Sequence, residues 1–300
     1  MLHLLNGDAS ASRFPASLPG ARAVWRDIMM EGPAVDDGAA RAAWLAPRLG
    51  VTPAEYEHRW REGQESLERA TTEDEVVLWF EQDLFCAVNV WFVLNRIPAT
   101  TPVSLVFPPL TPAFDGLGTL APEAFGSLLD GRTRIDDATR SEARALWRAY
   151  AAAEPTELAH VGGRFPFGRR AVRLHLGRFP STTHGLDEVE LATLQELVVG
   201  AQTFPALFRA VTRSGLVRPH GMGDVQFASA LRDLEPLVAI EGATAPPGQW
   251  RISLTDTGGD VLAERFDGLA NRALDRWLGG VRLRPGSRVW RWDGGRILRE

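Results

Sequence analysis

The first hundred residues alternate between short apolar runs and longer segments with helical periodicity. Four of the apolar runs are continuous, and they cover residues 1–6, 21–26, 75–80 and 103–107. Continuous apolar runs of this length are typical of parallel strands that helices cover on both faces. We therefore expect an α/β fold with an N-terminal Rossmann-like parallel sheet.

The predicted helices of this domain carry clear boundary signals. In the segment 52–70, Thr52 is the expected N-cap, Pro53 takes the first helical position and Glu55 takes the capping-box position. The segment 108–119 is rich in Pro and Gly, which is the composition of a connector. We place the first domain at residues 1–115.

The pattern is helical from residue 116 to residue 183. The clearest helix lies within 136–155, where apolar residues recur at helical spacing from Ala143 to Tyr150. A further helix is expected over 168–179, just before Pro180. We interpret 116–183 as a helical connector between the two halves of the chain.

The C-terminal part, 184–300, has the element order of a winged helix. Three helical segments are followed by two short strands, and these five segments are 185–200, 204–215, 223–235, 236–242 and 249–255. A fourth helix begins with Thr255 or Asp256 as its cap, and 279–298 alternates apolar and polar residues as exposed hairpins do. We expect a winged-helix-like α+β domain.

Composition narrows the class of protein. The chain has 300 residues, of which 45% are hydrophobic and 24% charged, and this balance is that of a globular protein. The longest apolar stretch, 87–97, is interrupted by two Asn and an Arg, so we expect no membrane span. The start of the chain lacks a signal-peptide pattern and Cys86 is the single cysteine, so we expect a cytoplasmic location.

Polar residues follow three of the four predicted strands. Because the carboxyl ends of parallel strands meet at one edge of a sheet, these residues are expected to share a ligand site. The carboxylates expected to be catalytic are Asp8, Asp27, Glu81 and Asp83. The residues expected to touch the ligand are His3, Asn6, Gly7, Arg26, Glu31 and Gly32.

Clustered carboxylates are compatible with three kinds of chemistry. They can hold Mg²⁺ or Mn²⁺, with Asp8 and Asp83 as the first ligands to consider, or they can form a metal-free acid and base pair. In the third interpretation Arg26 pairs with Asp8 or Asp27 and only pins the loops. Asp8 and Asp83 are also ordinary candidates for helix caps.

Two further residues have alternative roles. His3 lies within the first predicted strand, so it is either a satisfied core histidine or a ligand contact. Cys86 lies at the start of a predicted helix, where it is either a nucleophile with a lowered pKa or a small buried residue. The glycine-rich nucleotide motifs, GxSxG and HExxH do not occur in the sequence.

Three N-terminal blocks resemble a bacterial family called domain of unknown function 1835. The blocks are 3–14, 24–34 and 77–89, and the C-terminal half is similar to the tail often joined to that domain. The resemblance implies no established activity. It implies an acid and an amide where this chain has Cys86 and Ala87, so any role of those two side chains is absent or altered here.

We interpret the chain as a protein that binds a small molecule, phosphorylated or metal-bound, as a hydrolase or transferase would. The first alternative is a ligand-responsive transcriptional regulator that binds DNA. The net charge of −5 and the acidic balance of the third C-terminal helix, 223–235, argue against a nucleic-acid partner. The second alternative is a structural or protein-interaction module, and the oligomeric state stays open.

Overall fold

The structure is a computed structural model that describes residues 1–270, 272, 274–284 and 286–300. The chain folds into two compact units, Met1–Val172 and Arg173–Glu300. The fold is mixed α/β, as the sequence predicts. The three-part division at residues 115 and 183 stays a prediction.

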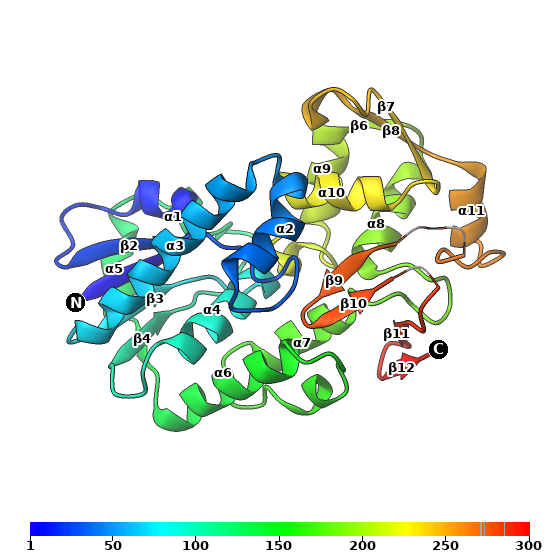
Figure 1. Cartoon of the computed structure of the whole chain (residues 1–300). Coiled ribbons are helices and arrows are strands. Elements are labelled where there is room, and N and C mark those ends of the chain that lie inside the picture. The colour runs from blue at the N-terminus through cyan, green and yellow to red at the C-terminus, as the bar shows by residue number, and fades with distance from the viewer. Residues whose placement is uncertain (271, 273, 285) are drawn as a thin grey trace. The chain divides into compact units, whose positions relative to one another are not determined.

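The first unit is built on a five-stranded sheet of order β2-β1-β3-β4-β5 (Figure 1). Its strands are β1 (Leu2–Asn6), β2 (Ala21–Trp25), β3 (Val76–Trp79), β4 (Val103–Val106) and β5 (Thr133–Arg134). The first four run parallel, which confirms the four predicted strands. β5 is antiparallel to β4 and escapes sequence detection because it consists of two exposed polar residues.

The helices of the first unit include seven α-helices and three short 3-10 turns among the described residues. The α-helices are α1 (Gly7–Arg13), α2 (Gly38–Leu49), α3 (Pro53–Arg69), α4 (Leu84–Arg96), α5 (Ala124–Asp130), α6 (Asp137–Tyr150) and α7 (Gly168–Leu176), and the last of them contains the boundary between the units. The turns are η1 (Ala70–Thr72), η2 (Leu117–Thr119) and η3 (Glu157–His160). Thr52 and Glu55 form the predicted capping box of α3.

Aromatic side chains fill both faces of the sheet. On one face Trp79 of β3 packs against Phe14, which follows α1, and Phe125 of α5, at ring distances of 5.2 and 5.5 Å. On the other face Trp25 of β2 packs against Trp60 of α3 and Phe92 of α4. The buried parallel sheet follows from apolar runs that have helices to cover them on both sides.

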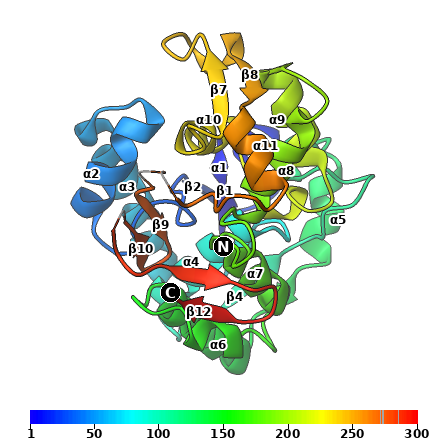
Figure 2. The same cartoon turned by 90° about the vertical axis from the view of Figure 1, so that its right-hand side faces the viewer.

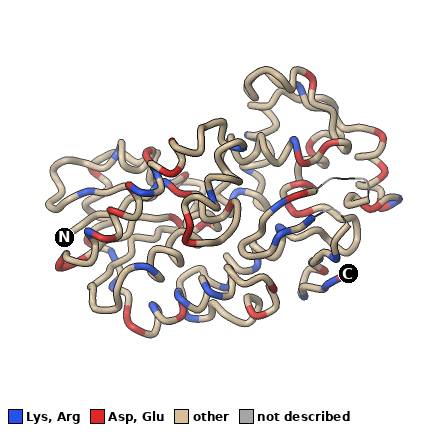
Figure 3. The backbone as a smooth tube through the Cα atoms, viewed as in Figure 1, with Lys and Arg blue, Asp and Glu red and all other residues tan. Residues whose placement is uncertain are grey.

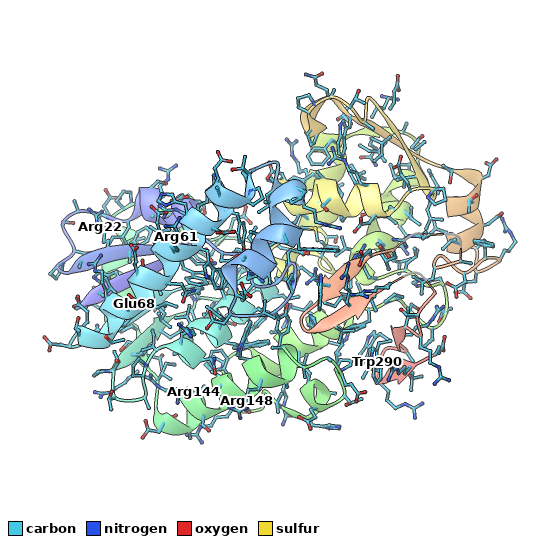
Figure 4. The ribbon with its side chains drawn as sticks, viewed as in Figure 1. Arg22, Arg61, Glu68, Arg144, Arg148 and Trp290 are labelled. Carbon is cyan, nitrogen blue, oxygen red and sulfur yellow. The ribbon has the colours of Figure 1, made fainter. Side chains whose placement is uncertain are left out.

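Arginines from α6 complete the carboxyl end of α4. Arg140 donates to the carbonyl oxygens of Pro98 and Thr101, and Arg144 donates to those of Leu94 and Ile97. Figure 4 shows Arg144 on α6 with Arg148 one turn further along. The last carbonyls of a helix have no partner within the helix, so Arg144 satisfies those at the end of α4, and Arg140 satisfies carbonyls of the loop that follows.

The second unit contains four further α-helices and a three-stranded antiparallel sheet of order β6-β8-β7 among the described residues. The helices are α8 (Glu188–Leu197), α9 (Phe204–Arg213), α10 (Asp224–Asp233) and α11 (Asp256–Leu262), with turns η4 (Arg218–His220) and η5 (Pro247–Gln249). The strands are β6 (Gln202–Thr203), β7 (Val238–Glu241) and β8 (Arg251–Leu254). Helices α8 and α9 pack against each other and against this sheet (Figure 2).

Two hairpins follow α11, and three of their four strands lie within or overlap the predicted segment 279–298, whereas β9 precedes it. They pair β9 (Arg276–Leu278) with β10 (Val281–Leu283) and β11 (Trp290–Trp292) with β12 (Ile297–Arg299). Thr255 is the N-cap of α11 and accepts a hydrogen bond from the backbone of Gly258. Among the described residues, every helix is too short or too polar to cross a bilayer.

Arginines near β9 enter a buried ionic cluster in the second unit. Arg272 donates two hydrogen bonds to the carboxylate of Glu190, and Arg276 bridges Asp187 and Glu190. Burial raises the pKa of Asp187, whereas the two arginines outweigh burial and lower the pKa of Glu190. The cluster therefore ties the hairpin segment to the amino end of α8.

Candidate functional site

The order of the strands reverses the direction of winding between β1 and β3. The chain passes from β1 to β2 on one side and then returns across β1 to β3. In open α/β sheets, ligands bind outside the carboxyl ends of the strands at such a reversal. Asn6 ends β1 at this edge, and Glu81 follows β3.

Asn89 of α4 connects the ends of β1 and β2. Its side chain is fully buried, and its amide nitrogen donates to Oδ1 of Asn6 at 3.0 Å and to the carbonyl oxygen of Asp27 at 3.1 Å. Its Oδ1 accepts a hydrogen bond from the backbone of Met29 at 3.0 Å. One amide group thus fixes two strand ends relative to α4.

A buried chain of hydrogen bonds continues from Asn6 to Glu81. Nδ2 of Asn6 donates to Sγ of Cys86 at 3.2 Å, and that thiol donates to Oε2 of Glu81 at 3.0 Å. The backbone N–H of Leu117 in η2 donates to Oε1 of Glu81 at 2.6 Å. Gly116 has φ +113°, and a Cβ built there would lie 3.1 Å from Oε1 of Glu81, so the turn approaches the carboxylate closely.

Asp83 is the buried acid of this edge. It is the N-cap of α4, as predicted, and its Oδ1 accepts a hydrogen bond from the backbone of Cys86 at 2.6 Å. Burial, together with the nearby charge of Glu81, raises the pKa of Asp83 to about 7. Burial also raises the pKa of the Cys86 thiol, so the sulfur lacks the lowered pKa of a reactive nucleophile.

Glu81, Asp83 and Cys86 offer a set of metal-ligating atoms. One ligand atom from each of the three residues lies within 4.8 Å of the other two. Asp8, which the sequence analysis pairs with Asp83 as a ligand of Mg²⁺ or Mn²⁺, is not part of this set. The sulfur atom makes the set better suited to a softer divalent cation than to Mg²⁺.

Asp27 is engaged by a buried arginine. Nε and NH2 of Arg41 bind its two carboxylate oxygens, each at 3.0 Å, and the hydroxyl group of Tyr56 donates to Oδ1 at 2.7 Å. The same guanidinium group donates to the carbonyl oxygens of Ile28, Glu31 and Pro33. This arrangement holds the loop after β2 in place.

Asp8 lies on the surface. Nε of Arg26 binds both of its oxygens, at 2.9 and 3.1 Å, and NH1 of Arg26 reaches Glu62 at 3.4 Å. The side chain of Asp8 is 70% exposed, so this ion pair is screened by solvent. α1 begins at Gly7, with φ +83°, so Asp8 lies in the first helical turn and not at the N-cap.

The structure places the other expected ligand residues as follows. His3 is fully buried within β1, where Nδ1 accepts from Trp79 and Nε2 lies 3.0 Å from the carbonyl oxygen of Pro19. Burial lowers the pKa of His3, which favours the neutral ring. Gly32 follows Glu31 with φ +70°, and a Cβ there would lie 3.1 Å from Trp44 and Leu45.

Sequence reasoning missed Asn89, Arg41 and Tyr56. Two of them carry a signal that is visible only in retrospect: Asn89 interrupts an apolar helix, and Arg41 lies among alanines in α2. Neither signal identifies the partner. Comparison of the chain with protein-family models, curated proteins and solved structures finds no match.

Proposed function

We propose that the first unit binds a small polar molecule at the carboxyl ends of β1 and β3, where Glu81 and Asp83 act as a base and an acid. The observation that carries the proposal is the close approach of two carboxyl groups, because one oxygen of Glu81 and one of Asp83 lie within 4.8 Å of each other, and burial beside Glu81 raises the pKa of Asp83 to about 7. Pairs of carboxyl groups with separated proton affinities are a recurring device of acid and base catalysis. Hydrolysis and group transfer are the reaction classes that such a pair serves.

The hydrogen bonds and the pKa of Asp83 indicate which of the two carboxyl groups is the base and which is the acid. Glu81 accepts hydrogen bonds from the Cys86 thiol and from the Leu117 backbone, which favours its use as an acceptor. Asp83 retains a proton near neutral pH, which it is able to donate. Asn6 donates to the Cys86 thiol that binds Glu81, and Asn89 holds Asn6, so we propose the two amides as positioning residues for Glu81. A divalent cation bound by Glu81, Asp83 and Cys86 is the alternative occupant of the same place.

A thermal-shift screen with nucleotides, sugar phosphates, Mg²⁺, Mn²⁺ and Zn²⁺ tests the proposal. A compound that binds the site raises the Tm of the wild type, and the shift is lost in Glu81→Gln and Asp83→Asn. Asp137→Asn, an exposed acid in the first turn of α6, is the matched control and keeps the shift. An equal shift in wild type and in Asp83→Asn for every active compound contradicts the proposal.

As a second candidate function, we propose that the second unit is the winged-helix-like domain of a regulator that binds DNA. Its support is the element order α8, β6, α9, α10, β7, β8 with the sheet order β6-β8-β7. The charge is less favourable: α10 carries Asp224, Arg232 and Asp233, and Arg232 stacks 4.7 Å above Trp250. Figure 3 shows basic residues interleaved with acidic ones along both units, which favours a protein or small-molecule partner over DNA.

Fluorescence anisotropy with a labelled DNA duplex tests the second candidate. A DNA-binding protein shows affinity that falls steeply as the salt concentration rises, because phosphate contacts release counterions. An affinity for the duplex that is undetectable at low salt contradicts DNA binding and leaves an interaction module as the proposal for this unit.

We also propose membership of the bacterial domain of unknown function 1835 family and a cytoplasmic location. The three blocks 3–14, 24–34 and 77–89 support the membership, and they contribute β1, the loop after β2 and the segment from β3 into α4. A single buried cysteine supports a reducing compartment. Fractionation of bacterial cells that express the tagged chain tests the proposed cytoplasmic location.

A further inference from the structure

A polar pocket lies at the amino ends of β3 and β4, at the opposite edge of the sheet from Glu81 and Asp83. Its volume is about 400 Å³, which is within the range of small-molecule sites. Its lining residues are Asp74, Glu75, Pro102, Ser104, Arg132 and Arg134. They come from the segments that enter β3 and β4 and from around β5.

Three of the lining residues, Glu75, Ser104 and Arg132, form hydrogen bonds with one another. Arg132 binds both oxygens of Glu75, at 2.9 and 3.2 Å, and the hydroxyl group of Ser104 donates to Oε1 of Glu75 at 2.6 Å. These contacts hold the pKa of Glu75 below its ordinary value. Glu75, Ser104 and Arg132 therefore form a rigid, charge-balanced floor.

Two opposite charges of the lining form no direct hydrogen bond or ion pair among the described residues, although Arg134 is attracted by Glu75 and Asp74 by the amino-terminal ammonium group. Arg134 lies directly opposite Ser104 in the β4–β5 pairing, so both side chains point to the same face of the sheet. Asp74 precedes Glu75 at the amino end of β3. Neither the Asp74 carboxylate nor the Arg134 guanidinium forms a hydrogen bond or an ion pair within the ranges that the structure describes.

We propose that this pocket binds a small zwitterion such as a free α-amino acid. Arg134 binds the carboxylate of the ligand, because a guanidinium fork matches that group, and Asp74 binds its ammonium group. A ligand with a single charge is a poorer match, since it binds only one of these two groups, neither of which has a direct hydrogen bond or ion pair among the described residues. This site is separate from Glu81 and Asp83, so the two proposals fail or succeed independently.

NMR titration of the full chain with each of the common amino acids, added singly, tests the inference. We expect saturable shifts of the backbone amide signals of 73–76 and 132–135 with at least one amino acid. Acetate and methylammonium, which each carry one of the two charges, are expected to bind at least tenfold more weakly. Equal binding of acetate or of methylammonium overturns the zwitterion proposal, as does the absence of shifts with every amino acid.

Substitutions locate the two contacts. Arg134→Gln and Asp74→Asn are each expected to weaken binding at least tenfold, and both side chains are exposed, so the fold is retained. Arg22→Gln and Glu68→Gln are matched controls, because these residues are also exposed in the first unit and lie outside the pocket lining (Figure 4). An amino acid that binds both site variants as tightly as the wild type overturns the assignment.

Discussion

Arg41 of α2 binds both carboxylate oxygens of Asp27, which follows β2, and both side chains are buried. The guanidinium group is fully buried, and its ion pair with Asp27 outweighs the effect of burial, so its pKa is raised. The Asp27 carboxylate therefore serves to fix the loop after β2, to which Arg41 also binds. Asp27 was expected to be catalytic, but its contacts favour a loop-pinning role. The third interpretation gave that role to Arg26, which pairs with Asp8, whereas Arg41 holds Asp27.

Arg41→Gln is expected to destabilise the protein by about 3 to 5 kcal/mol, because it leaves the Asp27 carboxylate buried without its partner. The free energy of unfolding from urea denaturation checks this value. Arg61→Gln, an exposed arginine of α3 (Figure 4), is the control and is expected to change stability by less than about 0.5 kcal/mol. A loss below about 1 kcal/mol for Arg41→Gln contradicts the role given to this pair.

Asn89→Leu is expected to destabilise the protein by about 2 to 4 kcal/mol, because Asn6, Asp27 and Met29 each lose a buried hydrogen-bond partner. The same denaturation experiment measures the effect. Asn95→Leu on the same helix is the matched control, since the structure gives its side chain no hydrogen bond within the described residues. Similar losses in the two variants contradict the proposal that Asn89 orients the strand ends.

The stability of the protein is expected to fall as the pH rises from about 4 to about 7, through the contribution of Asp83. Its pKa is higher in the folded chain than the ordinary value of 3.8, so the folded state binds this proton more tightly. The favourable contribution is present at low pH and is lost as the pH rises through about 7. Denaturation at several pH values measures it, and Asp83→Asn, which keeps a capping side chain, is expected to flatten the slope.

A direct titration separates this effect from those of other acids. The carboxyl carbon signal of Asp83, labelled with ¹³C, is expected to titrate near pH 7 in the wild type. In Glu81→Gln the midpoint is expected to fall, because the neighbouring negative charge that raises the pKa is removed. A midpoint near 4 in the wild type contradicts both this prediction and the acid role proposed for Asp83.

Arg144→Ala is expected to destabilise the protein by about 1 to 2 kcal/mol, because the carbonyl oxygens of Leu94 and Ile97 at the end of α4 lose their donor. Arg148→Ala, one turn along α6, is the matched control (Figure 4). The structure gives Arg148 an exposed side chain, so its loss is expected to stay within about 0.5 kcal/mol. Comparison of the two Tm values checks the difference, and equal values count against the capping role of Arg144.

The sequence by itself determined the four parallel strands of this protein, its clearest helices and several of their ends, whereas the short strand β5 escaped it. The four parallel strands follow from continuous apolar runs, and the caps Thr52 and Asp83 follow from side chains that bond the backbone three residues away. Such local contacts depend only on neighbouring residues, so their signals survive in a single sequence. The polar residues that follow these strands were also placed correctly at the carboxyl edge of the sheet, because parallel strands all end at that edge.

Only the tertiary structure decided what each of those polar residues faces. In the sequence, Asp8, Asp27 and Asp83 are all acids that follow a strand. In the structure, Asp8 is exposed to solvent and pairs with Arg26. Asp27 is bound by Arg41, and Asp83 is buried beside Glu81. Asn6 and Asn89 meet across 83 positions of the chain. Partners at that separation are chosen by burial and packing, and the resulting loss of solvent is what gives Asp83 its unusual proton affinity.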